Sequence, residues 1–254
     1  MSQTSLSATR VLLALESLAE EPELGVSDLS SSFGWSKSVT HRMLQSLVET
    51  GYAEQVPETD KYRLTTKLFV LGSSVVNRTG LTQVALPVME ELLAETGETV
   101  NLAVLDGTDI VFVLKVESEA LLGANIRIGS RFPAHATSLG KALLASFSEG
   151  RREELLDQMK FVQYTPNTIS DKEQLVEDLE ATRARGYAID REELSLAMRC
   201  VGAAIKNASG QAIAAISISV PASRLNEEEL GEYGERIAEA ANEISKKLGY
   251  VGQA

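Results

Sequence analysis

The sequence predicts an α+β protein in which a small three-helix domain closed by a β-hairpin precedes a larger domain of mixed helices and strands. Three observations lead to this fold class. Residues 1–66 carry three stretches of helical apolar spacing and then two short extended runs. Residues 67–80 are apolar but have no core of their own. Residues 81–254 alternate helices with strands that pair through short turns, which predicts a mainly antiparallel sheet with flanking helices.

The first two helices are defined by capping residues. A helix within SLSATRVLLALESLAE has Ser5 and Ser7 as candidate N-caps. Ser27 is the expected N-cap of a short second helix, and Gly34 supplies the tight turn after it. This turn leads directly into a third helix, as in a helix-turn-helix unit.

The third helix is expected over residues 37–49, between Ser36 as N-cap and Gly51. Its apolar stripe includes Val39, which leaves Thr40 exposed. The extended runs GYAEQV and KYRLT, joined by PETD, then form a hairpin and complete a winged helix-turn-helix. The polar and basic residues near the start of the third helix are Ser36, Lys37, Ser38, Thr40, His41 and Arg42.

These residues fit either a helix that reads the major groove of DNA or an ordinary solvated surface helix. The net charge of −12 argues against a general affinity for nucleic acid, because phosphate binding leaves a basic footprint. However, residues 29–48 and 61–89 contain no Asp or Glu. The distribution of charge therefore permits a local DNA-binding surface.

Residues 67–80 are interpreted as a linking helix that needs a partner. If the first domain stood alone, this helix would expose a set of large apolar side chains, so we expect it to pair with the same helix of a second subunit. The residues concerned are Leu68, Phe69, Leu71, Val75 and Val76.

The larger domain is expected to contain two β-hairpins and five helices. The hairpins are 98–105 with 110–117, and 200–207 with 211–220; the helices are 81–97, 136–147, 151–160, 171–185 and 226–248.

The second hairpin has one bulky face and one small face. A small face on the inside of a domain either packs closely against a helix or leaves a cavity. Two serines on such a face need hydrogen-bond partners, which favours a ligand cavity. The small residues are Cys200, Gly202 and Ala204 on one strand and Ala215, Ser217 and Ser219 on the other.

Composition argues against several classes of protein. Cys200 is the single cysteine, so no intramolecular disulfide can form. The chain starts without the apolar core of a signal peptide and has no apolar stretch near the ~20 residues of a membrane helix. We therefore expect a cytoplasmic protein without a membrane partner. With two histidines and one cysteine at no ligand spacing, neither a metal nor a cofactor is expected.

Five blocks of sequence resemble the IclR family of bacterial regulators in the same order. GWSKSVTHRMLQSLVETGYAEQ and KYRLTTKLFVLG are similar to its N-terminal half, and HATSLGKALLA, GYAIDREELSLAMRCVGAAI and AISISVPASRL to its effector-binding domain. The resemblance spans roughly residues 7–248. It implies a GAF-like C-terminal domain, a homodimer or dimer of dimers, and operator DNA binding under the control of a small effector. The order Ser38-Val39-Thr40 departs from the usual small-Thr-Val of the family, which leaves the operator sequence open.

The resemblance also implies an effector site. In relatives that bind glyoxylate-like acids, the site falls on positions that match Ser138, Leu139, Asp190, Cys200, Ser217 and Ser219. Ser138 and Leu139 lie in the first turn of a helix, where free N–H groups favour an anion. An aspartate beside a carboxylate ligand must be protonated, or must accept a hydrogen bond from a ligand hydroxyl or amide.

We therefore expect a transcription regulator that acts as a repressor and is controlled by a small carboxylate-like metabolite. An aromatic acid, a hydrazide or a ureide is the alternative effector. A second alternative is an enzyme with Cys200 as nucleophile, His135 as base and Asp190 as orienting group, although no further motif supports catalysis. A third is a constitutive DNA-binding protein whose larger domain only oligomerises.

Overall fold

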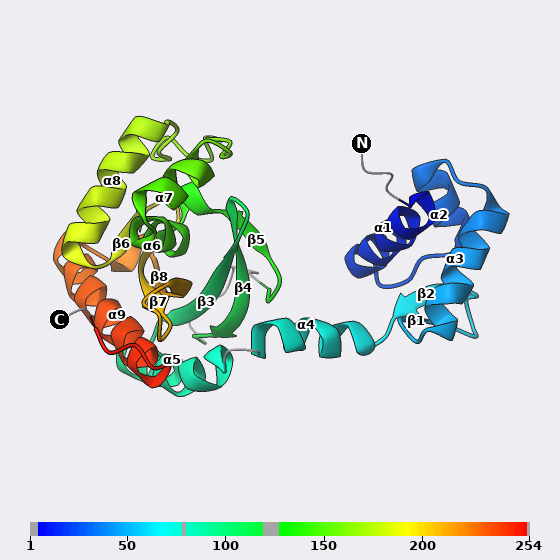
Figure 1. Ribbon diagram of the computed structural model, residues 1–254, viewed down its shortest axis with the longest axis horizontal. Helices are drawn as coiled ribbons and strands as arrows, with labels where there is room; N and C mark the ends of the chain where they lie inside the picture. Colours follow the sequence, from blue (N-terminus) through cyan, green and yellow to red (C-terminus); the bar gives the residue numbers. More distant parts are fainter. Residues whose placement is uncertain (1–4, 78–79, 119–126, 253–254) are drawn as a thin grey trace. The chain divides into compact units, whose positions relative to one another are not determined.

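The computed structural model describes residues 5–77, 80–118 and 127–252 and divides into two compact units, residues 1–76 and 77–254 (Figure 1). Each unit has its own buried apolar cluster. The winged helix-turn-helix lies in the first unit and the larger α+β domain in the second. The predicted fold class is confirmed.

The first unit contains three helices and one hairpin. Leu29, Leu44 and Tyr62 lie at the centre of its core. Ser5 caps the first helix through its side chain, which accepts a hydrogen bond from Ala8 N–H. The elements are α1 (Leu6–Glu20), α2 (Val26–Phe33), α3 (Lys37–Glu49), β1 (Ala53–Gln55) and β2 (Tyr62–Leu64).

The prediction that Ser27 caps the second helix is wrong. Gly25 is the N-cap of α2, and Asp28 closes the first turn by accepting a hydrogen bond from Gly25 N–H at 2.8 Å. An acidic residue at this position also suits the positive end of the helix dipole. Gly34 ends α2 in the left-handed conformation, as the tight turn requires.

The linking segment forms α4 (Lys67–Asn77). Phe69, Val70 and Leu71 leave 76%, 64% and 45% of their surfaces exposed in the single chain. Leu68 is half-buried. The predicted contacts of Val75 and Val76 lie outside the described side chains.

The second unit is built on a six-stranded antiparallel sheet with the strand order β5-β4-β3-β8-β7-β6. Its centre is the predicted second hairpin paired with the predicted first one. The strands are β3 (Thr99–Asp106), β4 (Asp109–Val116), β5 (Arg131–Pro133), β6 (Ala188–Arg191), β7 (Met198–Lys206) and β8 (Ala212–Pro221).

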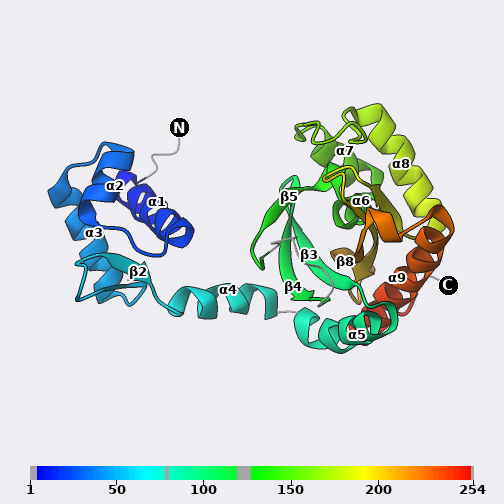
Figure 2. The same ribbon diagram turned by 180° about the vertical axis from the view of Figure 1, so that it is seen from behind.

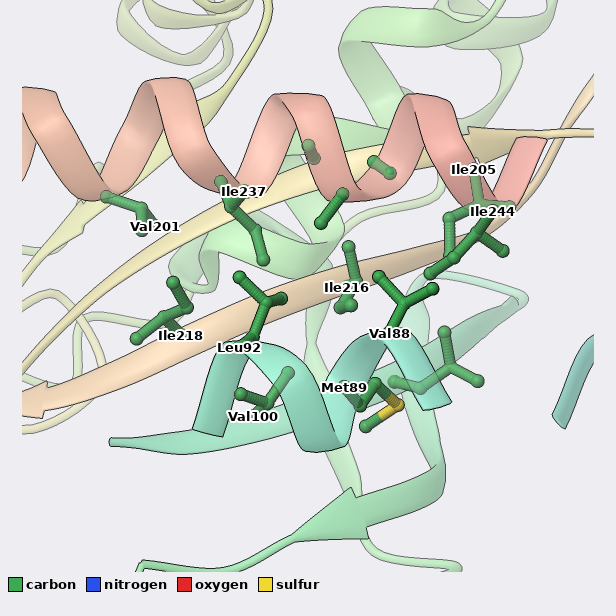
Figure 3. Close-up of a cluster of buried hydrophobic side chains, with 14 of the residues drawn as sticks. Val88, Met89, Leu92, Val100, Val201, Ile205, Ile216, Ile218, Ile237 and Ile244 are labelled. Atoms are coloured by element: carbon green, nitrogen blue, oxygen red, sulfur yellow. The ribbon is translucent and has the colours of Figure 1, made fainter. Parts of the chain in front are cut away.

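Helices cover both faces of this sheet (Figures 1 and 2). One layer consists of α5 (Leu81–Thr96) and α9 (Glu227–Lys247). Figure 3 shows bulky side chains of β7 and β8 facing these two helices, among them Val201, Ile205 and Ile216.

The other layer contacts the small face of β7 and β8. It contains α6 (Ser138–Ser146), α7 (Glu149–Leu156) and α8 (Lys172–Arg185), preceded by the 3₁₀ turn η1 (Ala134–Ala136). The short edge strands β5 and β6 were not predicted, because runs of three or four residues carry too little alternation to be recognised.

Candidate ligand-binding site and nucleic-acid interface

Helix α6 follows the tight 3₁₀ turn η1, and its start lies against β7. A Cβ atom on Gly140 would approach Ala134 O to 2.2 Å, so only glycine fits there. A Cβ atom on Gly202 would lie 3.0 Å from Ser138 C and O. The absence of side chains at these two positions lets the start of α6 reach the small face of the sheet.

The start of α6 and the small face of β7 and β8 enclose a cavity of about 50 Å³. It adjoins a larger cavity of about 480 Å³. The lining residues common to both cavities are Phe132, Asp190, Leu194, Cys200 and Ser219. All the predicted effector residues lie together on the inner cavity: Ser138, Leu139, Asp190, Cys200, Ser217 and Ser219. We call these two spaces the inner and outer chambers.

The two serines of β8 differ in their hydrogen bonding. Ser219 Oγ accepts from Asn101 Nδ2 at 3.0 Å and from Cys200 Sγ at 3.4 Å. Ser217 Oγ has no hydrogen-bond partner among the described residues, although the residue is only 1% exposed. Buried hydroxyls normally have a partner. Ser217 Oγ is therefore a free polar group that a ligand in the inner chamber would meet.

The first turn of α6 offers backbone donors to the same chamber. Thr137 caps the helix by accepting a hydrogen bond from Gly140 N–H at 3.1 Å. The N–H groups of Ser138 and Leu139 have no acceptor within the part of the chain that the structure describes. Donors at a helix N-terminus favour a negatively charged group.

Asp190 lies at the end of β6 and is almost fully buried. Its Oδ1 accepts a hydrogen bond from Glu193 N–H at 2.7 Å. Burial, and then the neighbouring Glu193 carboxylate, raise the pKa of Asp190 to about 7. The protonated form expected beside an anionic ligand is thus within reach at neutral pH.

A buried lysine holds this part of the wall. Lys141, in the second turn of α6, is 1% exposed, and its Nζ lies 2.5 Å from Glu193 Oε1 and 3.1 Å from Asp178 Oδ2. Burial raises the pKa of Glu193, while Lys141 opposes that rise. The second oxygen of Glu193 is buried without a partner among the described residues. The ion pair therefore ties α6 to the segment that follows Asp190.

Apart from Asp190, Cys200 and Ser219, the residues of the outer chamber were missed by sequence reasoning. Arg131 and Phe132 belong to the short strand β5, and Met198 is the first residue of β7. Tyr164 and Leu194 lie in irregular segments beside the sheet. Neither β5 nor the irregular segments carry a periodic pattern. The pair of Lys141 and Glu193 was also missed. A lysine inside the apolar run LGKALLA indicates that a charged partner is needed, but it does not say which one.

The residues of the alternative enzyme hypothesis do not form a nucleophile and base. Burial, with the Asp190 carboxylate, raises the pKa of the Cys200 thiol, which disfavours the thiolate that catalysis requires. His135 Nε2 lies 3.1 Å from Val162 O, and burial lowers the pKa of its ring. In the described residues, no group of three or more His, Cys, Asp or Glu side chains could hold a metal ion.

Helix α3 presents a polar surface at its start. Ser36, Lys37, Ser38, His41 and Arg42 are all exposed. Ser36 Oγ and Ser38 Oγ lie 3.3 Å apart. The three cationic or titratable side chains of this group make no ion pair within the described ranges. They are available to phosphates or base edges.

The expectation that Thr40 is exposed is wrong. Thr40 is fully buried, whereas Val39 is half-buried. Thr40 Oγ1 accepts from Ser30 Oγ at 3.0 Å and donates to Ser36 O at 3.2 Å, so it joins α2 to α3. Because a threonine can satisfy its hydroxyl inside a helix pair, the apolar stripe alone does not decide which neighbour faces inward.

The described helices are all either too short or too polar to cross a lipid bilayer.

Two family descriptions match this chain. The IclR helix-turn-helix domain matches residues 7–57, and the C-terminal domain of the bacterial transcriptional regulator IclR matches residues 73–246. The chain is 38% identical to the HTH-type transcriptional regulator XynR of Escherichia coli K12, over 96% of this chain and 97% of XynR. It is 36% identical to the transcriptional repressor IclR of the same organism, over 96% and 90%.

A solved structure of an IclR homologue from Microbacterium hydrocarbonoxydans, complexed with 4-hydroxybenzoate, has the same fold. The TM-score is 0.83 at 27% identity, and the match covers 95% of this chain and 98% of the other.

Proposed function

The chain belongs to the IclR family of bacterial transcriptional regulators, and we propose that a small acid bound in the inner chamber controls its binding to operator DNA. The protein is a DNA-binding regulator and not an enzyme. The proposal divides it into residues 1–66 for DNA binding, 67–80 for linking and dimerisation, and 81–254 for effector binding. Repression from the cytoplasm is the mode of action that we propose.

One observation carries the effector site. Six residues drawn from α6, β6, β7 and β8 line a single buried space in which several donors have no partner among the described residues. In our proposal, the ligand carboxylate lies at the N–H groups of Ser138 and Leu139. Ser217 binds a second oxygen, and the protonated Asp190 donates to the ligand. Cys200 supplies a neutral wall.

An aromatic acid is the second candidate, because the outer chamber is much larger than the inner one and contains aromatic side chains. Phe132 and Tyr164 line this space of about 480 Å³, which is within the usual range for pockets that hold drug-sized ligands. The ring would occupy the outer chamber while its carboxylate reaches the inner one.

A thermal-shift screen with small carboxylates, aromatic acids, ureides and hydrazides, followed by mobility shift with operator DNA, tests the effector proposal. Ser217→Ala removes a hydrogen bond to a charged group, which is worth roughly 1.5–3 kcal/mol, or more than tenfold in affinity. Operator binding without ligand should not change. Ser219→Ala should also lower the affinity for the ligand.

Ser148→Ala is the matched control, since Ser148 is exposed and lies outside both chambers. Wild-type ligand affinity in both pocket variants, measured by calorimetry, would show that the small face of the sheet is only a packing surface. A ligand that binds but never alters operator affinity would favour a constitutive DNA-binding protein.

We also propose that α4 mediates self-association, because its exposed apolar residues need a partner in water. Phe69→Glu places a charge in that contact and should dissociate the dimer. Sedimentation measures the result, with Leu12→Glu on the exposed side of α1 as control. An unchanged dimer in Phe69→Glu would place the interface elsewhere.

A further inference from the structure

The second unit contains a third cavity, of about 240 Å³, which no part of the effector proposal uses. It lies at the sheet edge beside the start of β6, because β6 begins at Ala188 opposite Gly202 and leaves the later residues of β7 without a partner on that side of the described sheet. Residues of α6, α8, β7 and α9 line it, and it shares no lining residue with the inner or outer chamber. We call it the edge cavity.

The charge of the edge cavity is opposite to that of the whole chain. Its lining contains Arg183 and Lys206 but no Asp or Glu, although the protein has a net charge of −12. Most cations of this unit make an ion pair, yet neither of these two makes one within the described residues. Lys206 is half-buried and its Nζ lies 5.4 Å from the centre of the Tyr250 ring.

Neutral donors complete the lining. Thr182 is 3% exposed, and its Oγ1 accepts from Arg185 Nη2 at 3.0 Å. Its own hydroxyl proton has no acceptor in the described ranges of the chain. Asn242 adds an exposed amide from α9. The remaining wall is largely alanine, so a ligand can approach the backbone closely: Ala142, Ala145, Ala203, Ala204, Ala238 and Ala241.

We propose that the edge cavity binds the phosphate group of a small phosphorylated metabolite. A phosphate monoester carries nearly two negative charges at neutral pH and has three strong acceptor oxygens. Two uncompensated cations match that charge, and the hydroxyl and amide donors match the remaining oxygens. The volume lies below the range of drug-sized pockets, which limits the rest of the ligand to a few carbon atoms.

Calorimetry on the full-length protein, with inorganic phosphate as the probe and ionic strength held constant, tests this site. Lys206→Gln and Arg183→Gln should each weaken phosphate binding at least tenfold, because each removes a charge-assisted hydrogen bond. Ala238→Leu fills the cavity without changing its charge and should weaken binding as well. Lys246→Gln, on the exposed end of α9, should bind phosphate as the wild type does.

Two further measurements distinguish phosphate in the edge cavity from phosphate in the inner chamber and from a general attraction of anions. Ser217→Ala alters the inner chamber alone, so it should keep wild-type phosphate affinity whether or not the effector proposal holds. Acetate, a monoanion, should bind more weakly than phosphate. The proposal is overturned if wild-type protein does not bind phosphate, if the edge-cavity variants bind it normally, if Ser217→Ala rather than Lys206→Gln loses it, or if acetate binds equally well.

Discussion

Helices α3 and α6 start with similar residues, but the two starts lie in opposite environments. Each follows an extended residue with a hydroxyl side chain, Ser36 in one case and Thr137 in the other. The polar residues at the start of α3 are exposed, whereas Ser138 in the first turn of α6 is buried against β7. Of the two N-caps, only Thr137 caps its helix through a side-chain hydrogen bond. Similar residues at a helix start therefore suit a macromolecular surface in one unit and a small-molecule chamber in the other.

The difference arises from distant residues. Gly202, far from α6 in sequence, leaves the space that α6 occupies, and no comparable element covers the start of α3 within the described part of its unit. Polar groups are consequently satisfied in different ways. Lys141 is held by the buried carboxylate of Glu193 and the half-buried carboxylate of Asp178, while Lys37 and Arg42 are solvated. Matched substitutions should distinguish the two regions. Those in the buried region around α6 should change the free energy of unfolding, and those on the exposed face of α3 should change the affinity for DNA.

The largest effect is expected from Lys141→Met. Removing the ammonium group leaves Glu193 and Asp178 without their buried partner, which typically costs about 3–5 kcal/mol. Lys37→Met on the exposed face of α3 should change the free energy of unfolding by less than roughly 0.5 kcal/mol. Chemical denaturation measures both values, and equal stability losses would remove the contrast between the helices.

A second variant keeps this test specific to charge. Glu193→Gln in the Lys141→Met background neutralises one of the two carboxylates that have lost their cationic partner, and it should recover part of the lost stability. No recovery would indicate that Lys141 acts through packing of its alkyl chain.

The next effect is a pH dependence confined to the buried region. Folding raises the pKa of Asp190 from 3.8 to about 7, so the folded state holds this proton more tightly than the unfolded state. The resulting stability is complete below about pH 4 and is lost as pH rises through 7, by up to about 4 kcal/mol. Asp190→Asn should flatten this profile in denaturation measured between pH 4 and 8.

The direction of this profile is the critical outcome. Stability that rises with pH in the wild type, and is unchanged by Asp190→Asn, would contradict the assignment. Glu193 also has a raised pKa, so a smaller slope of the same sign should persist in the variant. The affinity for a carboxylate effector should fall over the same pH range, since the ionised Asp190 repels it.

The sequence predicts the regular elements of the molecule better than the contacts between distant segments. Periodicity and caps located the long helices and both central hairpins, because each carries several turns or alternations of pattern. The chamber residues on β7 and β8 were identifiable by their small size, and the family resemblance supplied the others. Lys141–Glu193 and the outer chamber were not predictable, because their contacts join segments that are 52 residues apart or have no periodicity.

A third prediction addresses the exposed region. Arg42→Ala should weaken operator binding by roughly 1–3 kcal/mol if Arg42 contacts a base, or lower the salt dependence by about one charge if it contacts phosphate. Lys37→Ala should lower the salt dependence in the same way. The stability of the folded protein should remain that of the wild type in both cases. Footprints that neither substitution alters would exclude α3 as the reading helix.

The smallest expected effect tests the boundary between the two environments within α3 itself. Thr40→Val preserves the shape of a buried side chain but removes the hydroxyl that joins Ser30 to Ser36. It should lower stability by about 1 to 2 kcal/mol, since the Ser30 hydroxyl then has no partner.

Ser38→Ala, two residues earlier on the exposed face, is the matched control. It should leave stability unchanged while it alters operator affinity. Denaturation and mobility shift applied to both variants give opposite patterns if Thr40 is structural. If Thr40→Val changed operator affinity at unchanged stability, Thr40 would instead turn outward when α3 meets DNA.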